Sequence, residues 1–175
     1  MKGEMINSRK SLYSYEILPD TMRKSRQEIK ERHILEEILS QQVICRLALV
    51  DRGKPYIIPV NYGYREGCIY IHSSPEGKKM ELLRRRPELC FEVEDSVEIL
   101  KGGQACDWST RYRSVVGYGE VEILSDDTGK QHGLEVLMAQ HGAPYLKEFD
   151  AGHLKRMVIL KIRITSMTGK KSSSY

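Results

Sequence analysis

Short runs of apolar residues, several of them alternating with polar ones, recur along much of this chain, which is the pattern of β-strands that cover a core. Turn-forming residues such as Gly53, Gly67 and Pro87 separate the alternating runs. Because most of the joins are hairpin-like, six antiparallel strands in a closed barrel are expected, and the fold class is mainly β. The expected strands are 43–50, 55–64, 68–73, 89–100, 113–124 and 158–165.

A helical period of three to four residues replaces the alternation in three places. It predicts helices at about 26–40, from Pro75 to just before Pro87, and at 126–140. The first 20 or so residues have no clear period and are expected to form a loosely packed arm, residues 1–21. One domain over residues 22–171 and a tail over 172–175 complete the expected organisation.

Composition narrows the class of protein. The 175 residues suffice for one domain, 30% are charged, and no apolar run approaches the ~20 residues that span a bilayer. Residues 1–5 lack the apolar core of a secretory signal, and the four cysteines form no CxxC pair. A cytoplasmic protein without a metal site or a membrane role is therefore expected.

The net charge of +4, with a sequence pI near 8.8, is compatible with nucleic-acid binding but does not require it. Acidic stretches such as residues 92–98 interrupt any single basic face, and no nucleic-acid motif is present. Nucleic acid is therefore not an expected partner.

The segment 69–79, IYIHSSPEGKK, carries the clearest candidate chemistry. It predicts a strand that runs into a helix, with Ser74 as N-cap and Pro75 at the first helical position. Lys78 and Lys79 then lie in the first turn, where the helix dipole gives a cation no advantage. Two interpretations stay open: a solvated, charged first turn, or a phosphate site built from free N–H groups and two ammonium groups.

Three segments in register resemble one family. They are KPYIIPVNY at 54–62, YIHSSPEGKKMELLRRRP at 70–87 with CFEV at 90–93, and CDWSTRYRSVVGYG at 106–119. Together they resemble the NimA-like branch of the pyridoxamine 5'-phosphate oxidase-related flavoproteins, and the resemblance runs from about residue 22 to 171.

The resemblance implies a six-stranded antiparallel split β-barrel of the FMN-binding type. It also implies a homodimer that holds FMN in two symmetric grooves at the subunit interface. The implied cofactor-binding residues come from four segments of the chain. They are Pro59, Val60 and Asn61; Ile71, His72, Ser73 and Ser74; Lys78 and Lys79 at the phosphate; and Trp108, Ser109 and Arg111, which reach the groove from near the interface or from the partner chain.

Some of these residues have a plainer interpretation. Trp108 could be a half-buried anchor, and Arg111 could pair with a surface carboxylate. His72 could be a hydrogen-bonded structural residue, a flavin or substrate contact, or an axial haem ligand. NimA-like proteins often carry a histidine here, near the reacting nitro compound, which implies a catalytic role for His72.

The expected function is that of a flavin-dependent oxidoreductase that reduces nitroaromatic (5-nitroimidazole) compounds with electrons from a nicotinamide or another donor. Flavin chemistry requires no protein nucleophile, and the sequence contains no convincing catalytic triad or paired-carboxylate site. The alternative is a flavin-storage or haem-binding module without turnover, because fold does not fix function. FAD in place of FMN also stays open.

Overall fold

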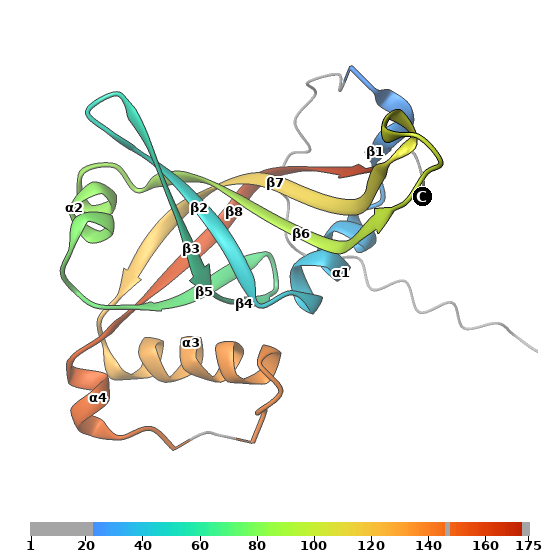
Figure 1. The fold of residues 1–175 in the computed structure, drawn as a ribbon. Coiled ribbons are helices and arrows are strands. Elements are labelled where there is room, and N and C mark those ends of the chain that lie inside the picture. The colour runs from blue at the N-terminus through green and yellow to red at the C-terminus, as the bar shows by residue number, and fades with distance from the viewer. Residues whose placement is uncertain (1–22, 146–147, 173–175) are drawn as a thin grey trace, which may run out of the picture.

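A computed structural model describes residues 23–145 and 148–172. One antiparallel sheet dominates it, with the strand order β3-β2-β6-β7-β8-β5-β4, and β1 pairs with β8 (Figure 1). The strands are β1 Glu28–Ile29, β2 Ile44–Asp51, β3 Lys54–Asn61, β4 Gly63–Arg65, β5 Cys68–Ser73, β6 Glu88–Leu100, β7 Ser109–Leu124 and β8 Val158–Lys171. The helices are α1 Arg32–Gln41, α2 Lys78–Arg85, α3 Asp127–Gln140 and α4 Ala151–Lys155, with 3₁₀ turns η1 Ser25–Gln27 and η2 Ala105–Asp107.

The mainly β, antiparallel class expected from the sequence is confirmed. The described sheet has eight strands instead of six, and its strand order ends at β3 and β4 without closing. One extra strand arises where the expected run 55–64 is broken. Tyr62 there is fully buried and its hydroxyl donates to the Leu39 carbonyl at 2.7 Å, which turns the chain between β3 and β4.

Two helices begin later than the sequence pattern suggested. The first begins at Arg32, because Ile29 is extended, buried and paired with Gly169 of β8. A side chain at Gly169 would overlap Leu35 and Ile29, so glycine allows this close approach. The second begins at Lys78, so Ser74 is not its N-cap; the Ser74 Oγ instead accepts from the Glu76 N–H at 3.2 Å in the preceding turn.

Inward side chains of the strands and of α1 and α2 fill the main core. A second, smaller apolar cluster lies between α3 and the opposite face of β5 and β8, which Figure 1 shows as the layer beneath the sheet. The fully buried members of the main core include Leu35, Ile38, Leu39, Leu47, Ile69, Met80, Phe91, Leu160 and Ile162.

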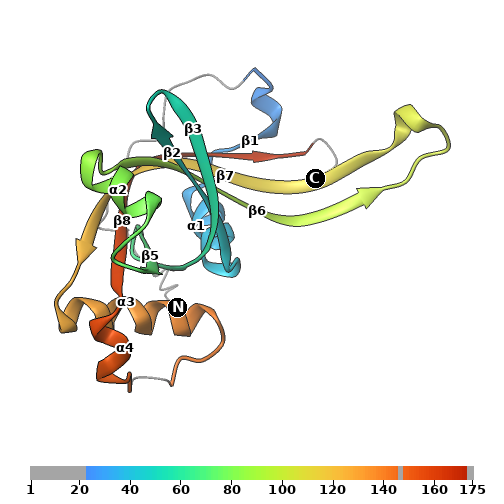
Figure 2. The same cartoon turned by 60° about the vertical axis from the view of Figure 1, so that its left-hand side comes forward.

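The β6–β7 hairpin is longer than expected. β7 already begins at Ser109 instead of residue 113, so the loop between the two strands is shorter than expected. Its distal part extends well away from the rest of the molecule (Figure 2). The pairing shifts between Asp95 and Glu98, where Ser96 has a φ of 53°, and this irregularity marks the point at which the hairpin leaves the core.

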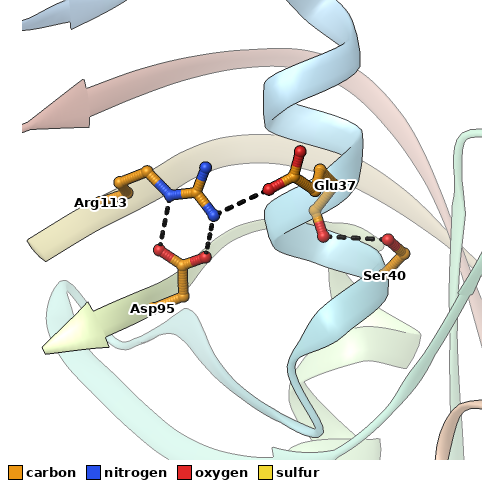
Figure 3. Close-up of polar contacts among 4 residues, drawn as sticks. All are labelled: Glu37, Ser40, Asp95 and Arg113. Carbon is orange, nitrogen blue, oxygen red and sulfur yellow. Dashed lines mark hydrogen bonds and ion pairs between the residues drawn. The ribbon is translucent and has the colours of Figure 1, made fainter.

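A buried ion pair lies at the base of this hairpin (Figure 3). The Arg113 Nε donates to Asp95 Oδ1 at 2.9 Å, and its Nη2 donates to the other Asp95 oxygen and, at 3.0 Å, to Glu37 of α1. The Asp95 side chain is 2% exposed and that of Arg113 is 17% exposed. The hydrogen bonding of Arg113 to the Asp95 carboxylate is the main reason why the pKa of Arg113 is raised above its ordinary value. The cluster joins β6, β7 and α1.

We expect Asp95→Asn to lower the free energy of unfolding by about 2–3 kcal/mol, because it leaves the Arg113 charge with only the half-exposed Glu37. Urea unfolding followed by circular dichroism measures the change. Glu98→Gln is the matched control, since Glu98 pairs with Arg111 at 3.0 Å farther along the same hairpin but is exposed. It should cost less than about 1 kcal/mol. Equal losses in the two variants would contradict a structural role for the buried pair.

Candidate functional site

The N-terminus of α2 is open to solvent. Its N-cap, Gly77, has a φ of +102°, and no atom would lie within 4 Å of a side chain added there. The first backbone hydrogen bond of the helix runs from the Glu81 N–H to the Gly77 carbonyl at 3.1 Å. The N–H groups of Lys78, Lys79 and Met80 precede this bond and point out of the helix end, where the dipole favours an anion.

The two lysines at this helix end differ in their surroundings. The Lys78 Nζ lies 2.8 Å from Asp51 Oδ2 and 4.7 Å from the centre of the Tyr56 ring, and its hydrogen bond is the main cause of the lowered pKa of Asp51. Lys79 is partly buried, and burial lowers the pKa of its ammonium group. Within the described residues Lys79 makes no ion pair. An anion at the helix end would therefore meet the Lys78 charge, which is shared with Asp51, and the Lys79 charge, which has no acidic partner among the described residues.

The β3 segment of the predicted site divides between two faces. Val60 packs against the core, whereas Pro59 and Asn61 are exposed on the other face of the strand. A ligand that lies along this strand would therefore meet the side chains of Pro59 and Asn61, and Val60 only through its backbone.

The β5 segment divides in the same way. Ile71 and Ser73 are buried on the core side, and the Ser73 Oγ donates to the Ser74 carbonyl at 2.9 Å. His72 is exposed on the opposite face, the one on which Tyr70 meets the ring of His132 edge to face at 5.4 Å. The alternation of the strand thus separates the His72 side chain from those of Ile71 and Ser73.

The third predicted segment lies far from α2 within one copy of the chain. Trp108 is 51% exposed, and Ser109 and Arg111 lie on the projecting hairpin, with Arg111 paired to Glu98 at 3.0 Å. In Figures 1 and 2 alike, this hairpin and α2 are at opposite ends of the sheet. One copy therefore does not bring Trp108 together with Lys79.

Sequence reasoning missed a hollow of about 670 Å³ over the outer face of the sheet. Its apolar lining includes Ala48 and Val50 of β2, Cys90 of β6 and Tyr118 of β7. Val50 and Tyr118 are 59% and 49% exposed, and Val116 and Ile57 on the same face are 40% and 62% exposed. The available signal was the presence of apolar residues at alternate, outward positions of these strands.

Three charged residues lie beside this apolar face. Arg46 is directly opposite Glu92 and Pro59 in the strand register, and its Nη1 donates to Glu92 at 3.1 Å and also to Glu94. Burial is the main cause, and the neighbouring Glu94 the next, of a Glu92 pKa raised to about 7. Glu92 and Glu94 alternate along β6, which the sequence shows, but their shared partner depends on the pairing of β2 with β6.

Comparison with known proteins identifies the family of this chain. A family model described as pyridoxamine 5'-phosphate oxidase matches residues 31–171. The chain belongs to the pyridoxamine 5'-phosphate oxidase-related family. The resemblance found in the sequence is thereby confirmed. No curated protein sequence matches the chain.

Several solved structures share the split-barrel fold. A candidate 5-nitroimidazole antibiotic resistance protein from Bacteroides thetaiotaomicron VPI-5482 is 30% identical with a TM-score of 0.70, over 82% of this chain and 86% of that one. A FAD and heme binding protein from Mycobacterium smegmatis has a TM-score of 0.75 at 22% identity, over 84% and 74% of the two chains. The flavocytochrome Anf3 from Azotobacter vinelandii has a TM-score of 0.74 at 17% identity, over 87% and 72%. The last two are similar in fold alone.

Two further properties of the described residues bear on the site. No group of three or more His, Cys, Asp or Glu side chains in residues 23–145 and 148–172 could hold a metal ion. None of the helices in these ranges has the length and apolar character needed to cross a membrane.

Proposed function

We propose that this protein is an FMN-dependent oxidoreductase that reduces nitroaromatic compounds. The observation that carries the proposal is the open N-terminus of α2, where free N–H groups lie beside the uncompensated Lys79 in a chain of this family. The 30% identity to a candidate nitroimidazole resistance protein supports the choice of substrate class.

The residues of the site fit a flavin phosphate. Gly77 leaves room at the helix end, the N–H groups of Lys78 and Lys79 can donate to phosphate oxygens, and the Lys79 ammonium can complete the contact. Ser74 lies in the turn just before, and the ring would follow β3 at Pro59 and Asn61. When bound, the flavin supplies the electron transfer, and the protein positions and shields it.

The proposed groove also needs a second subunit. Trp108, Ser109 and Arg111 are too far from α2 to share a ligand with Lys79 in one copy, but a hairpin that projects from the body can reach a partner (Figure 2). The outer face of the sheet, with exposed Val50, Ile57, Val116 and Tyr118, offers an apolar surface for that partner. We therefore propose a homodimer with two shared grooves.

Lys79→Ala should weaken FMN binding by about 10- to 100-fold, because a charge-assisted hydrogen bond is worth roughly 1.5–3 kcal/mol. Lys78→Ala should weaken FMN binding less, since the Lys78 ammonium already pairs with Asp51. The double variant should weaken FMN binding by about 100-fold or more. Fluorescence titration with FMN measures the affinities, and riboflavin, which lacks the phosphate, should bind all variants alike. Lys155→Ala is the control on α4. A double variant within about threefold of wild type for FMN would refute the phosphate placement.

The dimer can be tested through its proposed surface. Sedimentation should show a dimer at micromolar concentration, and Tyr118→Glu should produce a monomer that has lost flavin affinity, because it places a charge in an apolar interface. Tyr145→Glu is the matched control, since Tyr145 is 89% exposed in the segment that follows α3. A wild-type monomer that binds FMN would overturn the shared groove.

His72 is the proposed proton donor to the nitro substrate. His72→Ala should keep FMN and the dimer but lose about 10²–10⁴-fold in turnover of a nitroaromatic compound, the usual size of a general-acid effect. Absorbance of the substrate under reduced nicotinamide measures the rate, and His153→Ala, an exposed histidine on α4, is the control. Unchanged turnover would leave His72 without a catalytic role. A Soret band in the purified protein would favour the haem-binding alternative.

A further inference from the structure

A basic hollow lies where the two ends of the domain meet. It has a volume of about 560 Å³, within the ~300–1,000 Å³ typical of small-molecule pockets. Its cations are Arg23, Lys24, Arg26 and Lys171. Ser25, Gln27 and Ser172 complete the described lining with neutral hydrogen-bonding groups.

The packing of β1 fixes the position of this hollow. Glu28 and Ile29 pair with Lys170 and Gly169 of β8, and Ile29 is buried in the core. The turn η1 is therefore tied directly to the end of β8. The chain holds Arg23 to Arg26 against Lys171, although like charges brought together repel one another.

The acidic residues nearby are committed to other partners. Glu28 lies 3.7 Å from Lys30, and Arg113, the register partner of Lys171, holds both Asp95 and Glu37. None of the residues that line the described part of the hollow is acidic, and its four cations form no ion pair with residues 23–145 or 148–172. A concave surface lined by one sign of charge concentrates its field on a counter-ion.

Ser172 adds an oriented hydroxyl group. Its backbone N–H donates to the Tyr112 carbonyl at 2.9 Å, and its Oγ accepts from the Tyr112 N–H at 3.4 Å. Because the oxygen accepts this bond, the hydroxyl hydrogen stays available as a donor. Lys170, by contrast, is turned to the Tyr112 ring, 5.7 Å from its centre.

We propose that this hollow binds a small molecule that carries two or more linked phosphates, such as the diphosphate of a nucleotide. Two guanidinium groups and two ammonium groups suit several phosphate oxygens, and arginine binds them in a bidentate manner. A single phosphate would leave much of the volume and charge unused. The hollow is separate from the α2 end of the proposed flavin groove, since α2 and β1 lie at separate places on the sheet in both views (Figures 1 and 2).

Calorimetric titration of the full chain with pyrophosphate, ADP, AMP and inorganic phosphate tests the proposal. Pyrophosphate and ADP should bind more than about tenfold tighter than phosphate, and Arg26→Ala/Lys171→Ala should weaken both by more than about tenfold. If pyrophosphate and ADP bind with similar affinity, the hollow recognises the diphosphate. If ADP binds more tightly, the nucleoside contributes part of the recognition. Either result supports the site, and added salt should weaken binding.

Lys155→Ala/Arg156→Ala at the C-terminal end of α4 is the control, because it removes the same charge elsewhere and should leave binding within about twofold. Thermal unfolding and FMN titration of the Arg26/Lys171 variant should match wild type, which separates this site from the flavin groove. Equal losses in both double variants, or no wild-type binding at millimolar pyrophosphate, would overturn the proposal. Single-stranded RNA that binds far tighter than pyrophosphate, through Arg26 and Lys171, would overturn it in favour of a nucleic-acid surface.

Discussion

The ion pair between Arg113 and Asp95 is the interaction on which the projecting β6–β7 hairpin depends. A two-stranded hairpin with little core of its own is only marginally stable, so its base must be fixed. Asp95 does this from a fully buried position at the irregularity in β6, and Glu37 extends the contact to α1. Removing one partner would leave the partly buried Arg113 guanidinium without a compensating charge, which costs free energy. Separating the helix, the hairpin and the end of β8 is therefore unfavourable, and the three move as one unit.

The same pair affects the charge beside it. Because Arg113 engages Asp95 and Glu37, these carboxylates do not compensate Lys171, its partner in the register. The α2 end has a comparable arrangement, in which Asp51 takes up Lys78 and leaves Lys79 uncompensated. In both places, a local ion pair leaves a neighbouring cation available to an external anion.

Much of the fold could be predicted because short apolar or alternating runs between turn residues mark most of its strands. The bounds of β2, β5 and α3 differ from the expected ones by one residue or less at each end. The start of α2 could not be predicted, since Ser74 and Pro75 are good N-terminal residues and only the left-handed φ of Gly77 moves the helix to Lys78. β1 was missed because Ile29 suits a helical period as well as an extended contact with Gly169. The lysine pair at 78–79 could be singled out from the sequence because its chemistry is local, and its role at a phosphate stays a prediction.

The features that were missed depend on pairing between distant segments. The outer hollow combines β2, β6 and β7, and its apolar lining becomes one surface only in the observed register, in which Ala48 faces Cys90 and Cys90 faces Tyr118. The basic hollow combines residues from the two ends of the domain. Since a sequence pattern reports only which face a residue takes, it identifies single strands well and composite surfaces poorly. The surfaces that bind partners or ligands in a sheet protein are largely composite, so the register carries more of the function than any one strand.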